Sequence, residues 1–490
     1  MSHSHTIRLI INCAAFLPVS WWVIPLSAGE AFRFVDGNAK TVEAFLYENF
    51  DDRNFGMVVG LLDEHGSRVY SAGKLDNATD RSVDGDTLFE IGSVTKVFTA
   101  LLLLEAAQRG EVNVDDPVAK YLPKTARMPA RNGKEIKLIN LAAQDSGLPN
   151  NPTHPSGKAP EALSLEERKE LVESCTVDDL YTFASGHQLA HDPGERFIYS
   201  NVGMAILGQI LMQRTGKDYE SLVVDRICRP LKMESTCITL THAQRDRLAT
   251  SHLDDGVASE RLHLKGMVGS GALLSTANDL LRFLSATLAL TETHLKSQME
   301  EMQKVRHTNS TEFGRTATPW WDQGVYNPPG ADLLGHAGGT YGSKAFIGFD
   351  KAKRRGVVVL TNQARIAPNN VGWVLLQEVP LVPENIVSLV REVIGIGVAV
   401  ESDKASGLLR VSHVFPNSSA GKAGLSKGLL VQTINDVSVE RKALADCLTM
   451  LAVPNGTKVR LDLFDPEVKQ NRTVELTRRK FITRNDKPRS

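Results

Sequence analysis

Apolar helical stretches and short apolar strand-like runs fill the chain up to about residue 375. The stretch Val97–Leu104 is almost wholly apolar and ends near Gly110, a residue typical of a helix C-cap. A second apolar helix is predicted to begin at Val202. Because helices that are apolar on every side are buried, we expect both in the core of a sizeable domain.

Two apolar runs, Ser343–Phe349 and Arg355–Asn362, have the composition of strands. The segment that joins them, Asp350 to Arg355, is charged and suits a hairpin turn. The two runs therefore predict a pair of antiparallel strands, and with them a sheet beside the helices.

The pattern changes after about residue 376. Residues 376–389 contain Pro380 and Pro383 and are predicted to be a linker, with a helix-like stretch at 384–392. Residues 390–482 are predicted to form a small β-rich domain, and residues 483–490 a tail. The elements expected in this domain are strands at 408–415 and 429–435 with a helix-starting turn between them at 416–425, a helix at 441–452, and a hairpin formed by 458–464 and 473–477.

The first 28 residues have the pattern of a secretory signal. Arg8 precedes an apolar stretch from Leu9 to Leu26, and small residues up to Ala28 suit a cleavage site. This pattern predicts a periplasmic or secreted protein of the bacterial cell envelope. The alternative is an uncleaved membrane anchor, without which no stable membrane insertion is expected.

Composition narrows the function classes. The chain has 490 residues, of which 42% are hydrophobic, which suffices for more than one core. A net charge of −1 gives no reason to expect a nucleic-acid partner. The sequence has no His-Glu-x-x-His, Cys-x-x-Cys or phosphate-loop motif, so no metal and no cofactor are expected. Cys228 and Cys237 are close enough in sequence to form a disulfide, a question that the spacing leaves open.

Candidate chemistry begins at Ser93-Val-Thr-Lys96. On a helix, residues three apart share a face, so the amine can contact and activate the hydroxyl. The same Ser-x-x-Lys pattern recurs at Ser71 and Ser419, but only Ser93 precedes a long apolar helix. The simpler alternative is that Ser93 is a helix cap and Lys96 a solvated side chain.

Tyr199-Ser-Asn201 lies between a turn signal and the apolar helix that starts at Val202. A tyrosine hydroxyl, with a usual pKa near 10, acts as a base only where a cation lowers that pKa. Lys96 is the expected cation. The decoy Tyr47-Glu-Asn49 is more simply interpreted as an isolated tyrosine on a helix face.

The third motif is His336-Ala-Gly338, followed by Gly339 and placed before the predicted strands. Glycines allow an edge strand to approach a substrate closely and to point an N–H group at a developing oxyanion. The simpler alternative for His336 is a loop histidine.

The three motifs in this order resemble the penicillin-recognising serine hydrolases, which include class C β-lactamases, D-alanyl-D-alanine peptidases and related esterases. The resemblance covers about residues 33–375. It implies an α+β, β-lactamase/transpeptidase-like fold: an antiparallel sheet flanked by helices, with a helical subdomain between Ser93 and His336. Further matching segments are 115–123, 138–149, 230–233 and 269–279.

The resemblance also implies a role for each motif residue. Ser93 would be the nucleophile, Lys96 its activating partner and Tyr199 the proton shuttle. Asn201 would hydrogen-bond Lys96 or the substrate amide, and Asn151 would take the place of an amide-binding glutamine. The oxyanion hole would use the N–H groups of Ser93 and Gly339, beside Gly338.

Two departures from the family pattern stand out. His336 replaces a lysine that many β-lactamases carry, which favours the D,D-peptidase and esterase branch over efficient β-lactam hydrolysis. A neutral His336 would hydrogen-bond the substrate carboxylate or Tyr199, and activity would then fall toward pH 6, where an unperturbed histidine protonates. Alternatively, protonation supplies the missing charge, which is the behaviour that we favour for D-Ala-D-Ala-type substrates. Gln144-Asp145 stands where relatives commonly have His-Thr.

Residues 390–482 resemble a bacterial PDZ domain. Such a domain binds peptides as an added strand, and a glycine-rich loop receives the terminal carboxylate. The loop expected here comprises Ile394, Gly395, Ile396, Gly397 and Val398. The alternative is a structural cap on the hydrolase.

These features together predict a serine hydrolase that forms an acyl-enzyme on D-Ala-D-Ala-type peptides, esters or β-lactams, with D,D-carboxypeptidase or esterase activity foremost. The partners expected are a peptide or ester substrate, such as a cell-wall peptide, and a C-terminal peptide ligand of the PDZ-like domain. The competing hypothesis is a catalytically weak recognition protein that recruits peptides through that domain.

Overall fold

A computed structural model describes residues 34–484 with short gaps. The residues left out within that span are 52, 77–79, 159–161, 254–255, 309–313, 323–329, 379–380, 382–389, 404–405, 415–417, 443 and 452–455. The predicted signal, residues 1–28, and most of the predicted linker and tail therefore lie outside the described residues.

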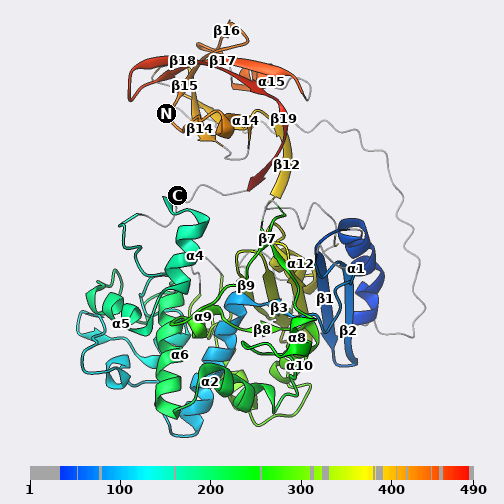
Figure 1. Cartoon of the computed structure of the whole chain (residues 1–490), viewed down its shortest axis with the longest axis vertical. Coiled ribbons are helices and arrows are strands. Elements are labelled where there is room, and N and C mark those ends of the chain that lie inside the picture. The colour runs from blue at the N-terminus through cyan, green and yellow to red at the C-terminus, as the bar shows by residue number, and fades with distance from the viewer. Residues whose placement is uncertain are drawn as a thin grey trace, which may run out of the picture.

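A five-stranded antiparallel sheet organises the first unit, with strand order β2-β1-β11-β10-β9. Figure 1 shows helix α1 (Phe34–Phe50) beside strands β1 and β2 of this sheet. The strands are β1 (Gly56–Asp63), β2 (Gly66–Gly73), β9 (Leu333–Gly339), β10 (Lys344–Asp350) and β11 (Arg355–Thr361). The hairpin predicted at 343–362 is confirmed, since Lys344 to Asp350 pairs in register with Thr361 to Arg355. The third motif, expected to precede a strand, instead lies within β9, at one edge of the sheet.

Both faces of this sheet are covered. Every residue of β1 is buried, and alternate side chains belong to different clusters. Met57 and Val59 pack with helices α1 (Phe34–Phe50) and α12 (Pro368–Leu376). Val58 packs on the opposite face with α2 (Thr95–Gln108) and α10 (Ala277–Thr287). This three-layer arrangement follows from strands that are apolar on both sides.

A helical subdomain stands between β3 (Phe89–Glu90) and β9, as predicted. Its central helices, α2 and α6 (Asn201–Thr215), pack together and are apolar nearly all round. Ser200 caps the start of α6, and Gly216, with a φ of 68°, ends it in the left-handed conformation. The other helices are α3 (Leu138–Ala142), α4 (Leu165–Glu173), α5 (Val177–Gly186), α7 (Tyr219–Val223), α8 (His242–Arg245), α9 (Val268–Gly271) and α11 (Lys296–Met302).

Short elements connect these parts. They are the 3-10 turns η1 (Gly92–Val94) and η2 (Val118–Tyr121), the π-helical turn η4 (Val224–Cys228), and the strand pairs β3 with β8 (Leu274–Ser275), β4 (Ala130–Arg131) with β5 (Lys134–Glu135), and β6 (Ser251–His252) with β7 (Ala258–Ser259). Cys228 and Cys237 are both free buried thiols in this structure. The disulfide that the spacing left open is thus absent here.

The C-terminal unit is β-rich and has its own core. Its main sheet runs β13-β14-β15-β17-β18, with β16 beside β15, and β12 pairs separately with β19. The apolar core includes Val411, Leu461 and Leu463. Its elements are β12 (Val390–Gly395), β13 (Val398–Ser402), β14 (Leu409–Val414), α14 (Ser419–Lys422), β15 (Leu430–Ile434), β16 (Val437–Ser438), α15 (Leu444–Leu451), β17 (Lys458–Asp465), β18 (Gln470–Thr477) and β19 (Arg479–Arg484).

Three expectations near the unit boundaries need correction. The helix-like stretch predicted at 384–392 is strand from Val390 onward, because β12 finds a partner in β19. The predicted tail begins inside β19, whose pairing to β12 depends on contacts far apart in sequence. Ile394 and Gly395, expected in a loop, end β12, so that only Ile396 and Gly397 remain between β12 and β13.

Candidate active site

The turn that carries Ser93 is fixed by its two ends. Strand β3 pairs with β8, and Ile91 N–H donates to Leu273 O at 3.1 Å. Gly92 has a φ of +48°, a conformation that favours glycine, and lets the chain turn into η1. Ser93 therefore lies in a 3-10 turn directly before α2, and Lys96 lies in the first turn of α2.

Ser93 and Lys96 are in contact, as their spacing predicts. Lys96 Nζ donates to Ser93 Oγ at 2.9 Å and to Ser270 O at 2.6 Å. The Lys96 side chain is completely buried, and burial lowers its pKa well below 10.5. An amine with a lowered pKa is neutral part of the time, so it can accept the proton of the serine hydroxyl.

Tyr199 belongs to the same group. Lys96 Nζ lies 4.8 Å from the centroid of the Tyr199 ring. Tyr199 stands two residues before α6, which packs on α2. The tertiary packing of these two helices therefore brings the second motif to the first.

A residue that the motifs did not reveal holds Tyr199 from both sides. Gln144 Oε1 accepts the N–H of Ser200 at 2.6 Å, and Gln144 O accepts the N–H of Ile198 at 2.7 Å. Gln144 is buried and has a φ of +61°. A strained conformation of this kind is kept only where surrounding contacts require it. Gln144 thus fixes the backbone on each side of Tyr199.

Asp145, the residue directly after Gln144, contacts a different segment of the chain. Its buried carboxylate accepts from Asn140 Nδ2 at 2.8 Å and from His307 Nε2 at 2.9 Å. Arg306 Nε lies 3.5 Å away. Gln144 and Asp145 therefore join the end of α3 to Tyr199 on one side and to residues 306–307 on the other.

The two predicted amide-binding residues lie together. Asn201 Nδ2 donates to Asn151 Oδ1 at 3.0 Å, and Asn201 N–H donates to Asn150 O. Lys96 was one of the two partners expected for Asn201, but the described contacts of Asn201 do not include Lys96. An Asn–Asn pair retains further donors and acceptors, which suits the binding of a substrate amide.

Strand β9 lies against the Ser93 turn at its two glycines. A β-carbon on Gly338 would lie 1.9 Å from Ile91 O and 3.0 Å from Ser93 N. A β-carbon on Gly92 would lie 2.6 Å from Gly339 N. The backbones of Ser93 and Gly339, the two expected oxyanion donors, are therefore neighbours, and only glycine permits this approach.

His336 is placed differently from the expectation. Its side chain is 1% exposed, Nδ1 lies 2.8 Å from Ala337 O, and Nε2 is buried without a hydrogen-bond partner among the described residues. Burial and the nearby Lys96 lower the pKa of His336 to about 3. The favoured expectation, a His336 that is protonated near pH 6, is therefore wrong, and its alternative, a neutral imidazole, agrees with the buried position of the ring. The sequence does not show how deeply this residue is buried.

A first prediction concerns the pH dependence that His336 confers. The unfolded chain binds a proton at His336 below about pH 6.5, whereas the folded chain stays neutral there down to about pH 3. The free energy of unfolding should therefore fall as pH drops through this window, by about 2 kcal/mol at pH 5. We expect His336→Gln to flatten the decrease in Tm between pH 7 and pH 5. An unchanged slope in the variant would contradict the buried neutral histidine.

The turn after Gly339 is held by a buried carboxylate. Glu90 Oε2 accepts from Thr340 Oγ1 at 3.1 Å and from Ser251 Oγ at 2.9 Å, while Oε1 accepts the N–H of Leu262. Ser343 Oγ lies 2.6 Å from Ser251 Oγ. Because Glu90 lies three residues before Ser93, this network couples the nucleophile turn to the turn between β9 and β10.

The two decoy copies of Ser-x-x-Lys have other contacts. Lys74 Nζ donates to Asp80, and Ser71 lies in β2. Ser419 Oγ donates to Thr477 O within the C-terminal unit. The long apolar helix after Ser93 therefore distinguished the Ser93–Lys96 pair, which is in contact, from the two other copies of the pattern.

In the described part of the chain, no group of three or more His, Cys, Asp or Glu side chains has the arrangement of a metal site. No helix among these residues has the length and apolar character needed to cross a membrane.

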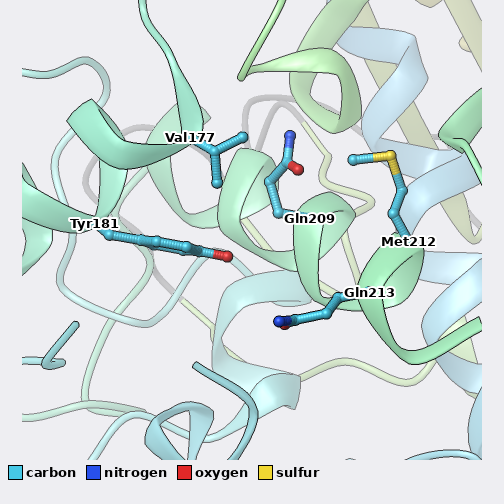
Figure 2. A pocket seen from close by; sticks show the side chains of 5 residues that line it. All are labelled: Val177, Tyr181, Gln209, Met212 and Gln213. Carbon is cyan, nitrogen blue, oxygen red and sulfur yellow. The ribbon is translucent and has the colours of Figure 1, made fainter. Parts of the chain in front are cut away.

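A surface pocket of about 360 Å³ lies between α5 and α6 (Figure 2). Val177 and Tyr181 come from α5, and the other lining residues, Gln209, Met212 and Gln213, come from α6. Gln209 is eight residues along α6 from Asn201, about 12 Å at the rise of an α-helix. This pocket is therefore separate from the group around Ser93.

An antiparallel sheet between helical layers, with a Ser-x-x-Lys turn against its edge strand, defines the α+β fold of β-lactamases and transpeptidases. A model of the Beta-lactamase family matches residues 40–379, and the chain belongs to this family. Its membership in this family of enzymes, expected from the motifs, is thereby confirmed.

Two curated relatives are similar to this chain. AmpH of Escherichia coli strain K12, a D-alanyl-D-alanine-carboxypeptidase/endopeptidase, is 29% identical over 248 residues, which cover 51% of this chain and 61% of AmpH. A β-lactamase of Yersinia enterocolitica is 25% identical over 343 residues, which cover 63% of this chain and 82% of the relative. The match to AmpH thus spans about three fifths of that protein's length.

Solved structures support the fold. The β-lactamase/D-alanine carboxypeptidase of Yersinia pestis, complexed with citrate, has a TM-score of 0.56 at 22% identity, covering 70% of this chain and 99% of that one. The octameric penicillin-binding protein homologue of Pyrococcus abyssi has a TM-score of 0.61 at 19% identity, covering 91% and 98%. At these identities the likeness concerns the fold alone.

Proposed function

We propose that this protein is a serine hydrolase that forms an acyl-enzyme at Ser93 on D-Ala-D-Ala-type peptides, related esters or β-lactams. The observation that carries the proposal is the 2.9 Å contact between Ser93 Oγ and the amine of the fully buried Lys96. Such an amine is a suitable base for a hydroxyl nucleophile at neutral pH. The name of AmpH supports peptides as the foremost substrate class.

The proposed reaction uses the residues around Ser93 in turn. Lys96, with Tyr199 beside it, takes the proton of Ser93 as Oγ attacks the substrate carbonyl, and the N–H groups of Ser93 and Gly339 stabilise the oxyanion that forms. The proton then passes to the leaving amine or alkoxide. Asn151 and Asn201 bind the substrate amide. Water attacks the acyl-enzyme in the second half of the reaction, and the same bases remove its proton.

Labelling with a fluorescent penicillin and with a fluorophosphonate tests this function. We expect both probes to modify the wild-type protein at Ser93, as mapped by mass spectrometry of tryptic peptides. A panel of p-nitrophenyl esters and peptides ending in D-Ala-D-Ala then ranks the substrates. A folded protein that takes neither probe and turns over no substrate in the panel would refute the proposal.

The C-terminal unit is proposed to be a PDZ-like domain over about residues 390–482, after a linker at 376–389. Support comes from the order of its elements and from β13, which lies at an edge of the sheet directly after Ile396 and Gly397. An edge strand behind a glycine-containing turn is the arrangement that binds a peptide by strand addition. The proposed ligand is the C-terminal end of a peptide.

Secretion is proposed from the signal pattern at 1–28. The corresponding location is the periplasm or the outside of the cell, where cell-wall peptides are available as substrates. Fractionation of cells that express the full chain, combined with N-terminal sequencing, tests both the location and cleavage after Ala28.

A second prediction follows from the position of the catalytic candidates. Every one of them precedes residue 340, so a chain that ends at residue 385 should hydrolyse small esters within about twofold of the full chain. Turnover of larger peptide substrates should decrease, because the proposed peptide-binding domain is lost. Steady-state kinetics on both substrate types, with circular dichroism to verify folding, measure this. Loss of ester turnover by a folded short chain would show that the C-terminal unit completes the active site.

A further inference from the structure

The edge of β9 needs a cation if the substrate carries a carboxylate. The two nitrogen bases of the motifs cannot supply one: His336 is buried and neutral, and burial also favours the neutral form of Lys96. A charge that meets a carboxylate at this edge must come from another element.

Lys344 is the residue that the sheet brings to this edge. It begins β10 and pairs in register with Gly339, the last residue of the edge strand β9. Its side chain is half-buried, while Gly339 is exposed. Lys344 Nζ lies 3.5 Å from Thr340 O, the first residue beyond β9.

The side chain of Lys344 crosses over Gly339. A β-carbon on Gly339 would lie 2.9 Å from Lys344 Cδ and 3.0 Å from Lys344 Nζ, so the lysine occupies the space where a side chain at 339 would stand. Since a β-carbon lies about 2.5 Å from its own amide nitrogen, the ammonium is within about 5.5 Å of Gly339 N. Glycine at 339 thus leaves room for the Lys344 side chain, whereas the approach of the Ser93 turn to β9 depends on Gly92 and Gly338.

The base of Lys344 is held firmly. Its neighbour Ser343 belongs to the buried network of Glu90, Ser251 and Thr340. Both ends of the turn between β9 and β10 are therefore fixed by hydrogen bonds. A cation on a rigid turn can recognise a carboxylate at a defined position.

We propose that Lys344 is the residue of this site that binds the carboxylate of the substrate. The proposal rests on the proposed function, in which Ser93 attacks a carbonyl whose oxygen lies at Gly339 N. In a peptide that ends in D-alanine, the terminal carboxylate is three bonds beyond the carbonyl carbon that is attacked. A carboxylate at that distance lies within reach of the ammonium, and the charge-assisted bond favours acids over neutral analogues.

Paired substrates test this on the full-length protein. One is an N-acetylated tripeptide that ends in D-Ala-D-Ala, and its neutral partner is the same peptide with a C-terminal amide. A second pair is benzylpenicillin and its methyl ester, and the rate at which each acylates Ser93 is measured. p-Nitrophenyl acetate reports on the catalytic machinery without either group.

Lys344→Met removes the charge and keeps the length of the side chain. We expect KM for the acid peptide, and the corresponding constant for benzylpenicillin, to rise about 10- to 100-fold. The amide, the methyl ester and p-nitrophenyl acetate should stay within about twofold. Lys344→Arg should restore most of the acid preference. Lys351→Met, which removes an exposed lysine directly after the other end of β10, is the matched control and should change nothing.

Three results would overturn the proposal. The first is an unchanged KM for the acids in Lys344→Met. The second is an equal loss on acids and neutral analogues, which would assign Lys344 to the oxyanion or to folding. The third is a wild-type protein that labels at Ser93 and shows no acid preference in either pair. Failure of Ser93 to label at all would refute the proposed function, and the separate labelling result distinguishes the two cases.

Discussion

Ser93→Ala is expected to abolish covalent labelling and to reduce turnover by about 10⁴- to 10⁶-fold, because it removes the atom that forms the acyl-enzyme. Lys96→Met should cost nearly as much. Since the two residues act as one unit, the double variant should be little worse than either single variant. Rates of ester hydrolysis and intact-protein mass spectrometry after labelling measure both effects.

The stability of Lys96→Met separates a catalytic role from a structural one. Lys96 buries an amine completely, which disfavours folding, and methionine fills a similar volume without that cost. The variant should therefore melt at or above the Tm of the wild type while its activity is lost. Lys74→Met, in the decoy Ser-x-x-Lys copy, is the control and should keep full activity. A labelled peptide containing Ser71 or Ser419 would show that the nucleophile is misassigned.

Gly338→Ala is the second change with a large expected effect. The new β-carbon would lie 1.9 Å from Ile91 O and 2.9 Å from Val94 N, and these backbone atoms cannot rotate away as a flexible side chain can. The Ser93 turn and β9 must then separate. We expect a loss of stability of about 3 kcal/mol and a decrease in kcat of about 100-fold, the effect of displacing a catalytic group by roughly 1 Å.

The matched control for Gly338→Ala is Gly186→Ala. Gly186 lies at the end of α5, has no positive φ, and a β-carbon there would meet nothing within 4 Å. This substitution should be neutral or should stabilise the protein by about 0.5 kcal/mol. Thermal melts and ester kinetics of both variants give the comparison. Equal behaviour of the two would mean that β9 does not lie against the nucleophile turn as closely as described.

Local sequence was sufficient where function depends on neighbours along the chain. The Ser93–Lys96 contact follows from helical spacing, and the β10–β11 hairpin from two apolar runs with a charged turn. The joint order of three motifs then placed Tyr199 with Lys96. Contacts of this kind can be predicted from periodicity or from family resemblance.

Contacts between distant segments were beyond the sequence. Nothing near Gln144 indicates that its amide accepts the N–H of Ser200, 56 residues later. Ser270, whose carbonyl oxygen accepts a hydrogen bond from Lys96 Nζ, lies in the matching segment 269–279, but the motifs did not predict this contact. The burial of His336 depends on packing against elements such as the ring of Trp321, and so its neutral state could not be predicted. In the C-terminal unit, the β12–β19 pairing overrode a local helical pattern.

The Gln144–Asp145 pair constrains how this protein can change during evolution. Exchange of Asp145 for threonine would remove the carboxylate that Arg306 and His307 share. Exchange of Gln144 alone would withdraw the acceptor from Ser200. Asp145, Arg306 and His307 should therefore be replaced together, because loss of the shared carboxylate leaves both of its partners without it. Gln144 contacts backbone N–H groups, so its replacement is constrained by the side chain that enters and not by the identity of residues 306 and 307.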